Sequence, residues 1–235
     1  KKSIPIIFII AILLTGERAN FIRSFFGLFF LIFIFAEINW KKKIIIFVLM
    51  LLFSTLVINI APKRGGLSAV TGRFLQVYTQ INTIEKIKSL PEKNIYFRHY
   101  RAAIEIFKKY PIFGVGNKNF GEVCHKNENW HKVLKAKGAC STHPHNVWFE
   151  FLAEHGLIGS LIFLGIIFFI LIENLKIFFR NKNYIHLSST LYLFLVFFPF
   201  LPGGAFFSNF NSTLFWINFA IMISFSKING GHDKN

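Results

Sequence analysis

The chain has 235 residues, of which 53% are hydrophobic and 32 are phenylalanine, and its formal net charge is +16. This composition argues against an ordinary soluble domain, because so short a chain cannot cover so many apolar residues. The fold class that it predicts is all-α: a polytopic helical membrane protein with a large, mostly helical loop outside the membrane.

The apolar residues come in blocks close to the length that a helix needs to cross a bilayer, roughly 20 residues. A shorter block, Ser3–Thr15, opens the chain, which lacks an initiating Met and a signal-peptide pattern. We therefore expect a truncated first helix and read the chain as the C-terminal portion of a longer membrane protein. Strict alternation is absent, which favours helices over barrel strands. The longer blocks are Phe21–Ile38, Ile44–Ile60, Val147–Ile172, Ile185–Leu201 and Phe206–Phe225.

Charged residues indicate how these segments are oriented. Lys and Arg cluster in the short connections and at the ends, on one side of the predicted helices, and this pattern marks the cytoplasmic side. The long loop then lies in the periplasm, and its 15 Lys and Arg against 5 acidic residues do not change this, because long loops escape the rule. The predicted segments are transmembrane helices over 1–60, a periplasmic loop domain over 61–146, transmembrane helices over 147–226 and a cytoplasmic tail over 227–235.

The loop is expected to fold back on the membrane helices. Gly72–Leu90 has a weak helical pattern that Pro91 should end, and Ile95–Tyr110 has the spacing of an amphipathic helix. Pro111 ends that helix, and the glycines at 114 and 116 predict a tight turn rather than a dinucleotide site, since the third glycine and preceding strand are missing. The expected apolar face consists of Tyr96, Tyr100, Ala103, Ile104 and Phe107.

The two cysteines, Cys124 and Cys140, lie in the same loop with 15 residues between them. An oxidising periplasm favours a disulfide between them. A zinc site that adds His125, His131 and His143 is the alternative, but its spacing matches no standard zinc framework. We expect the disulfide and no metal.

The strongest candidates for chemistry lie just before the fourth predicted helix, at Val147. His143, His145 and Asn146 precede that helix, and Asn146 can cap it through its side chain. Histidine titrates near neutral pH, which suits a general base. Because Pro144 turns the chain, the two imidazoles need not point the same way, and His143 is expected to contribute less than His145.

Other charged residues near the predicted membrane boundary face the same outer side. Glu154 shares a helix face with Glu150, and acidic residues there usually line a cavity; the alternative is that Glu154 only orients the helix and binds interfacial lipid. Arg18, between the first two helices, is either an anion site or an arginine that anchors the helix end. Arg98 and Arg101 lie on the amphipathic helix of the loop.

Three motifs, in this order, resemble those of the O-antigen ligase and polymerase superfamily. The first is Thr-Gly-Glu-Arg, which ends at Arg18. The second runs from Ala103 to Phe120 as Ala-x-x-Ile-Phe-x-x-x-Pro-Ile-Phe-Gly-Val-Gly-x-x-x-Phe. The third is His-Pro-His-Asn-x-x-x-Glu-x-Leu-Ala-Glu-x-Gly-x-x-Gly, from His143 to Gly159. The resemblance covers roughly residues 11 to 165. It implies a multi-pass protein of the bacterial inner membrane whose active site faces the periplasm and which serves lipopolysaccharide or polysaccharide synthesis.

The resemblance also implies roles for individual residues. The arginine after the small-residue turn matches Arg18, and the histidine before asparagine matches His145. The family's loop arginine is less direct, because its Gly-Arg-x-x-x-Trp pattern is replaced here by Tyr96-Phe-Arg-His-Tyr100; Arg98 is the first choice. The expected catalytic residues are thus His145, Arg18 and Arg98. Secondary, substrate-binding candidates are Arg101, Arg73, His143, Asn146 and Glu154.

The implied activity is that of a metal-independent, inverting glycosyltransferase without a cofactor. Arginine can hold a diphosphate bidentately, and the outer loop has no aspartate cluster to hold Mg²⁺. The implied donor is a glycan on undecaprenyl diphosphate, and the acceptor is lipid A-core, as in an O-antigen ligase. The protein would also contact membrane lipid; no nucleic-acid partner is expected. Chain polymerisation and protein O-glycosylation share these motifs and stay open. A transporter or a non-catalytic assembly partner is the alternative from another class.

Overall fold

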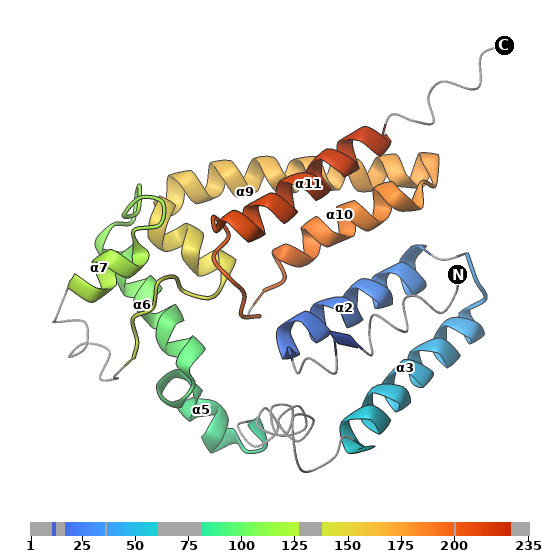
Figure 1. Cartoon of the computed structure of the whole chain (residues 1–235), viewed down its shortest axis with the longest axis horizontal. Helices are drawn as coiled ribbons and strands as arrows, with labels where there is room; N and C mark the ends of the chain where they lie inside the picture. Colours follow the sequence, from blue (N-terminus) through green and yellow to red (C-terminus); the bar gives the residue numbers. More distant parts are fainter. Residues whose placement is uncertain are drawn as a thin grey trace. The chain divides into compact units, whose positions relative to one another are not determined.

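The computed structural model describes residues 11–12, 17–35, 37–60, 81–126, 138–199 and 201–226. These residues form helices and connecting turns, and no β-strand occurs among them, which confirms the all-α prediction (Figure 1). Contacts divide the chain into two units, Lys1–Ser89 and Leu90–Asn235. Each unit is described by itself.

Unit 1 is built on phenylalanine packing between two helices. The ring of Phe47 lies 5.9 Å from that of Phe25 and 5.6 Å from that of Phe29. Its centroid is also 5.6 Å from that of Phe33, and the Lys43 ammonium donates to the Phe33 carbonyl at 2.8 Å. The first two predicted long blocks therefore form a helical pair, whereas Ser3–Thr15 falls almost wholly outside the described residues. The elements are α2 (Arg18–Phe30), the π-helical turn η1 (Leu31–Phe35) and α3 (Trp40–Ile60).

The loop helices begin with α5 (Ile84–Lys93) and α6 (Ile95–Lys109). The expected stop at Pro91 is wrong, because α5 continues through this proline for a further two residues. The break comes instead at Asn94, whose side chain accepts from the Tyr96 N–H at 2.9 Å and so starts α6. A proline in the last turn removes at most one helical hydrogen bond, so a capping residue can set the boundary.

The amphipathic helix predicted over 95–110 is present as α6, but its buried face is rotated from the expected one. Ile104 is exposed, and Tyr96 and Phe107 are only partly buried. The rotation follows from His99, a polar residue that is buried because its ring has a hydrogen-bond partner. The face that packs inward consists of His99, Tyr100, Ala102, Ala103 and Ile106.

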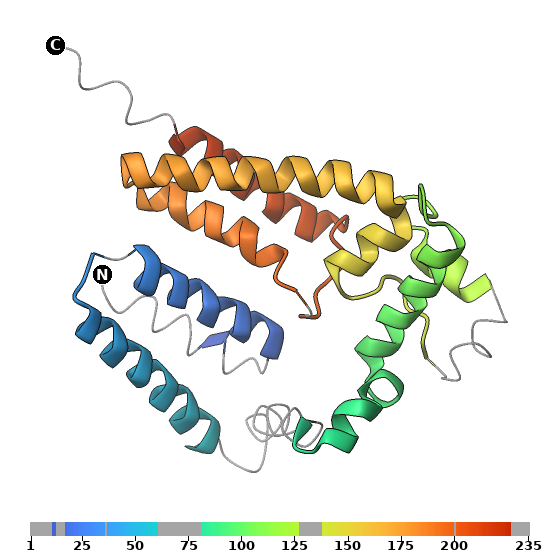
Figure 2. The same ribbon diagram turned by 180° about the vertical axis from the view of Figure 1, so that it is seen from behind.

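Three further helices of unit 2 lie side by side in Figures 1 and 2. Their shared core contains Phe151, Leu171, Leu193, Phe206 and Phe215. Within the described residues, α9 is the helix that is long and apolar enough to cross a membrane, and α10 is a shorter apolar helix. The helices are α9 (Val147–Asn181), α10 (Tyr184–Val196) and α11 (Asn209–Ser226); the short α7 (Phe120–Lys126) belongs to the loop.

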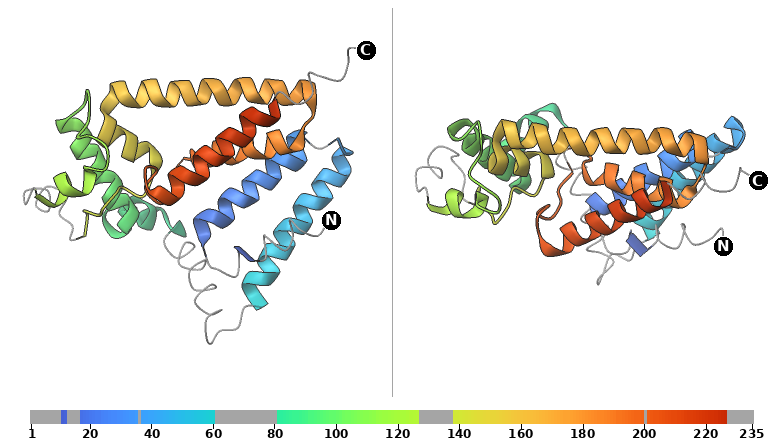
Figure 3. Two further views of the ribbon diagram at one scale, coloured as in Figure 1. Left: turned by 45° about the horizontal axis from the view of Figure 1, so that its top comes forward. Right: turned by 90° about the horizontal axis from the view of Figure 1, so that it is seen from above.

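A sharp bend divides α9 at Gly156, where the backbone has φ 62° and ψ −165° (Figure 3). The helix predicted from Val147 is present, but the bend was not predicted: a short helical arm precedes Gly156 and the long apolar stretch follows it. Only glycine adopts this backbone conformation readily. Glu150, Glu154 and the helix cap Asn146 all belong to the short arm.

The turn after α6 packs against α9, as the sequence predicted, and it does so at this bend. The Leu157 N–H donates to the Pro111 carbonyl at 2.8 Å, and the Val115 N–H donates to the Ala153 carbonyl at 3.0 Å. A Cβ added at Gly156 would lie 2.4 Å from the Ile112 carbonyl oxygen. The two backbones are thus too close for any side chain at this position.

Candidate active site

The short arm of α9 begins at Asn146, whose buried side chain both accepts and donates hydrogen bonds. Its carboxamide oxygen accepts from the Trp148 N–H at 3.0 Å and from the Phe149 N–H at 3.4 Å, so it caps the helix as expected. Its amide nitrogen donates to the Leu201 carbonyl at 3.3 Å. The cap therefore ties the start of α9 to the turn between α10 and α11.

That turn, residues 197–208, is fastened to the arm at three further points. The Gly203 N–H donates to the His145 carbonyl at 2.8 Å, and the Trp148 indole N–H donates to the Phe197 carbonyl at 2.9 Å. The buried Glu150 carboxylate accepts from the Phe206 N–H at 3.1 and 2.9 Å. No sequence motif marked this turn as part of the site.

Three imidazoles gather where the arm meets the loop. The ring centroids of His143 and His145 lie 4.1 Å apart, and that of His99, from α6, lies 5.2 Å from His145. The two rings thus lie together, which Pro144 between them did not require. His145 itself adopts a left-handed backbone conformation, φ 59°.

The Nε2 atom of His145 lies 3.2 Å from the Ser141 hydroxyl oxygen, and the Tyr96 ring stands edge-on at 5.6 Å between centroids. Burial, together with the nearby His143 and His99, lowers the pKa of His145 to about 4, against a hydrogen bond with the Gly203 backbone that raises it. Burial likewise lowers the pKa of His143. Both rings are therefore neutral at pH 7 and can accept a proton.

An apolar cavity of about 180 Å³ adjoins the same arm. It is lined by Asn146, Trp148, Phe149 and Pro199, so it lies between the arm and the turn that is fastened to it. Phe149 also stacks on Tyr100 of α6, with ring centroids 4.6 Å apart. The cavity thus lies beside Asn146, the residue that follows His145.

The remaining predicted residues are placed as follows. Arg98 and Arg101 are partly buried on α6, and the Arg98 guanidinium donates to the Lys93 carbonyl at 3.1 Å. Arg18 opens α2 in unit 1, a body described separately from the one that carries the histidines. Arg73 lies outside the described residues.

Glu154 is buried, and its carboxylate is used by backbone groups of the loop. One oxygen accepts from the Lys118 N–H at 2.8 Å and the other from the Phe120 N–H at 3.2 Å. These contacts hold the start of α7 against the arm. The structure thus gives Glu154 a part in joining the loop to α9.

Cys124 and Cys140 form a disulfide, with an S–S distance of 2.03 Å. Cys124 is buried in a core that joins α6, α7 and the arm of α9 and includes Ile106, Phe120 and Ala153. Over the residues that the structure describes, no group of three or more His, Cys, Asp or Glu could hold a metal ion.

These features define a helical protein with a cluster of three histidines at the head of an apolar helix. The sequence model of one family, described as O-antigen ligase, matches residues 4–164. The chain belongs to this O-antigen ligase family, as its three motifs indicated. No curated protein and no solved structure matches it significantly. The family indicates a glycosyltransferase-like activity that acts on glycan and lipid-linked substrates.

Proposed function

We propose that the protein transfers a glycan from an undecaprenyl diphosphate carrier to an acceptor at the periplasmic face of the bacterial inner membrane, as an O-antigen ligase. The observation that carries this proposal is the half-buried His145 just before α9, whose lowered pKa leaves it neutral and whose Nε2 atom lies 3.2 Å from the Ser141 hydroxyl oxygen. Transfer to a sugar hydroxyl needs a proton acceptor at such a place.

The reaction is a single displacement with inversion at the anomeric carbon. The acceptor oxygen forms a bond to that carbon, and the bond from the carbon to the phosphate oxygen breaks. The undecaprenyl diphosphate leaves with the electron pair, and the hydroxyl proton passes to His145. Arg18 and Arg98 neutralise the leaving group, because guanidinium binds phosphate oxygens bidentately, so the chain's own cations supply the charge in place of a metal ion.

The membrane setting of this proposal comes from both the sequence and the fold. The long apolar part of α9 crosses the bilayer with the other predicted spans, and the short arm before Gly156 lies at the periplasmic surface. A lipid-linked donor can then reach the histidines from the side, and the apolar cavity beside Asn146 lies along that route. Arg73, Arg101, His143 and Asn146 are secondary candidates for holding the substrate.

Lipid A-core is the proposed acceptor because the matched family is described as O-antigen ligase. Chain polymerisation and protein O-glycosylation use the same donor and differ only in the acceptor hydroxyl. A transporter or an assembly partner without catalytic activity would not require a neutral His145 beside the Ser141 hydroxyl.

The test is transfer by the purified protein in detergent from a synthetic undecaprenyl diphosphate-linked glycan, with EDTA present. Lipid A-core, a second donor chain and a serine-containing peptide serve as parallel acceptors. We expect glycosylated lipid A-core and free undecaprenyl diphosphate. Transfer only to another acceptor would reassign the substrate, and loss of transfer in EDTA would contradict a metal-independent reaction. Donor binding without transfer to any acceptor would contradict the proposed enzymatic activity.

A further inference from the structure

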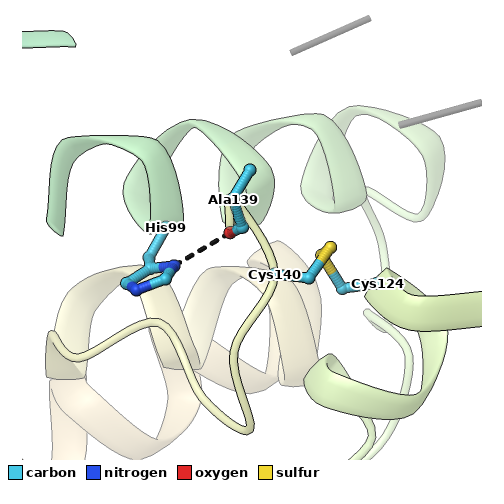
Figure 4. The surroundings of a disulfide bond; sticks show 4 residues. All are labelled: His99, Cys124, Ala139 and Cys140. Carbon is cyan, nitrogen blue, oxygen red and sulfur yellow. Dashed lines mark hydrogen bonds between the residues drawn. A yellow bond between two sulfur atoms is a disulfide. The ribbon is translucent and has the colours of Figure 1, made fainter. Parts of the chain in front are cut away.

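His99 is the third histidine of the cluster, and the sequence analysis assigned it no role. It lies on α6 and is 5% exposed. Its Nδ1 atom is 2.9 Å from the Ala139 carbonyl oxygen (Figure 4). A carbonyl oxygen can only accept, so Nδ1 carries the proton and Nε2 is the acceptor in the neutral ring.

The carbonyl that anchors His99 is itself held from a second side. Ala139 precedes Cys140, whose disulfide to Cys124 ties it to α7, as Figure 4 shows. A Cβ added at Gly121 of α7 would lie 3.0 Å from the Thr142 Cα, so α7 also packs directly against the next residues. Because the anchor is buried and cross-linked, His99 has a fixed partner in the folded protein.

On its inner side His99 packs against His145, with an interplanar angle of 33° between the rings. The other titratable groups against His145 are His143 and Tyr96, and Ser141 lies at its Nε2 atom. The His145 ring thus lies between residues of α6 and its own loop. Among these neighbours, His99 is held by a residue 40 positions away in the sequence, Ala139.

We propose that His99 is a positioning residue for His145: anchored on the Ala139 carbonyl, it holds the His145 imidazole in the orientation from which the acceptor proton is taken. This inference rests on the proposed function, because it takes His145 as the base. It also places the Cys124–Cys140 disulfide in the support of the site, since that bond holds the segment that carries the anchor.

Two substitutions separate the parts of this role. His99→Asn keeps a donor that can reach the Ala139 carbonyl but removes the ring, and His99→Phe keeps a ring but removes the donor. Each should lower kcat for transfer about 10- to 100-fold with the donor KM within about twofold, because misplacement of a catalytic group acts on the chemical step. In both, the acid limb of the pH–rate profile should move to higher pH, since His99 is one of the neighbours that lower the pKa of His145.

The matched control is His186→Asn. His186 is also a buried histidine, with Nε2 2.9 Å from the Asn174 carboxamide oxygen, but it lies in the first turn of α10. This change should leave the acid limb where it is in the wild type. A fall in activity of His99→Asn with an unmoved acid limb would mean a merely structural role and would overturn the proposal, as would wild-type kcat. If His99→Phe does not fold, His99→Asn decides.

His145→Ala in the same series tests the role of His145 as base separately from the positioning role of His99. If His145→Ala is inactive while the His99 variants keep the wild-type kcat and acid limb, the positioning role fails and the proposed function stands. Normal turnover by His145→Ala would remove the proposed base, and with it the premise of this inference.

Discussion

A neutral imidazole at the head of α9 is the residue-scale basis of the proposed chemistry. Burial and two neighbouring histidines hold the pKa of His145 at about 4, so the free protein has an uncharged base at neutral pH. A bound diphosphate adds negative charge and would raise this pKa toward the working pH. The donor would thereby strengthen the base that the reaction needs.

The pH profile should respond to His143. Its charge is the second cause that lowers the pKa of His145, after burial. Catalysis by the neutral ring is lost as the pH falls through that pKa, so His143→Ala should shift this loss to higher pH. At pH 8 it should lower the transfer rate less than His145→Ala does. The measurement is the transfer rate between pH 4 and 8. An acid limb that does not move, in a folded variant, would show that the two rings are not coupled.

Arginine chemistry gives a second prediction at this scale. Arg18→Lys should damage transfer although the charge survives, because lysine cannot form the two parallel hydrogen bonds that guanidinium makes to phosphate. Losing one charge-assisted contact costs about 1.5–3 kcal/mol, which is roughly a tenfold to hundredfold loss in rate. Steady-state kinetics of the variant provides the measurement. Wild-type kinetics in Arg18→Ala would exclude Arg18 from the site.

At the scale of elements, the bend of α9 is what brings the loop and the helix together. Gly156→Ala places a Cβ 2.4 Å from the Ile112 carbonyl oxygen and forces alanine into φ 62°. We expect the free energy of unfolding to fall by about 1–3 kcal/mol, seen as a lower midpoint of thermal unfolding in detergent. Gly165→Ala, on the same helix with nothing within 4 Å of the new Cβ, is the control and should not lower the midpoint. Equal midpoints in the two variants would contradict the docking.

The Cys124–Cys140 disulfide is the second feature at this scale, and it stabilises the loop. Replacing both Cys124 and Cys140 by serine should lower the free energy of unfolding by about 3 kcal/mol, the value expected for a closed loop of this length. Denaturant titration of oxidised and variant protein measures it. Mass spectrometry without reductant should find the Cys124–Cys140 peptide pair; two free thiols in protein from an oxidising compartment would reject the bond.

Sequence reasoning found the helices and the glycine turn, because apolar blocks and glycine–proline punctuation are local signals. It missed the kink at Gly156, since a lone glycine in an apolar run does not show what packs against it. It also missed His99, which is buried only because the Ala139 carbonyl, 40 positions away, satisfies its ring. Such long-range hydrogen bonds decide which polar residues are buried, and the chain's local pattern does not encode them.

For the whole molecule, the predicted topology places the loop and the far end of α9 on opposite sides of the membrane. Asn117 is exposed in the loop, and Lys182 is exposed at the far end of α9. In cells carrying Asn117→Cys, a thiol reagent that cannot cross the inner membrane should label the protein before lysis. In Lys182→Cys it should label only after lysis. The reverse pattern would place the loop in the cytoplasm and remove the proposed access of the lipid-linked donor to the histidines.

The central claim is that His145 takes the proton of the acceptor hydroxyl. The most direct measurement is the single-turnover rate of glycan transfer by His145→Ala, beside the affinity of the same variant for the undecaprenyl diphosphate-linked donor. General-base catalysis contributes about 10²–10⁴-fold, so we predict a loss of that size in rate with donor affinity close to wild type. A wild-type rate in His145→Ala would contradict the account and leave His145 as a packing residue beside the Asn146 cap.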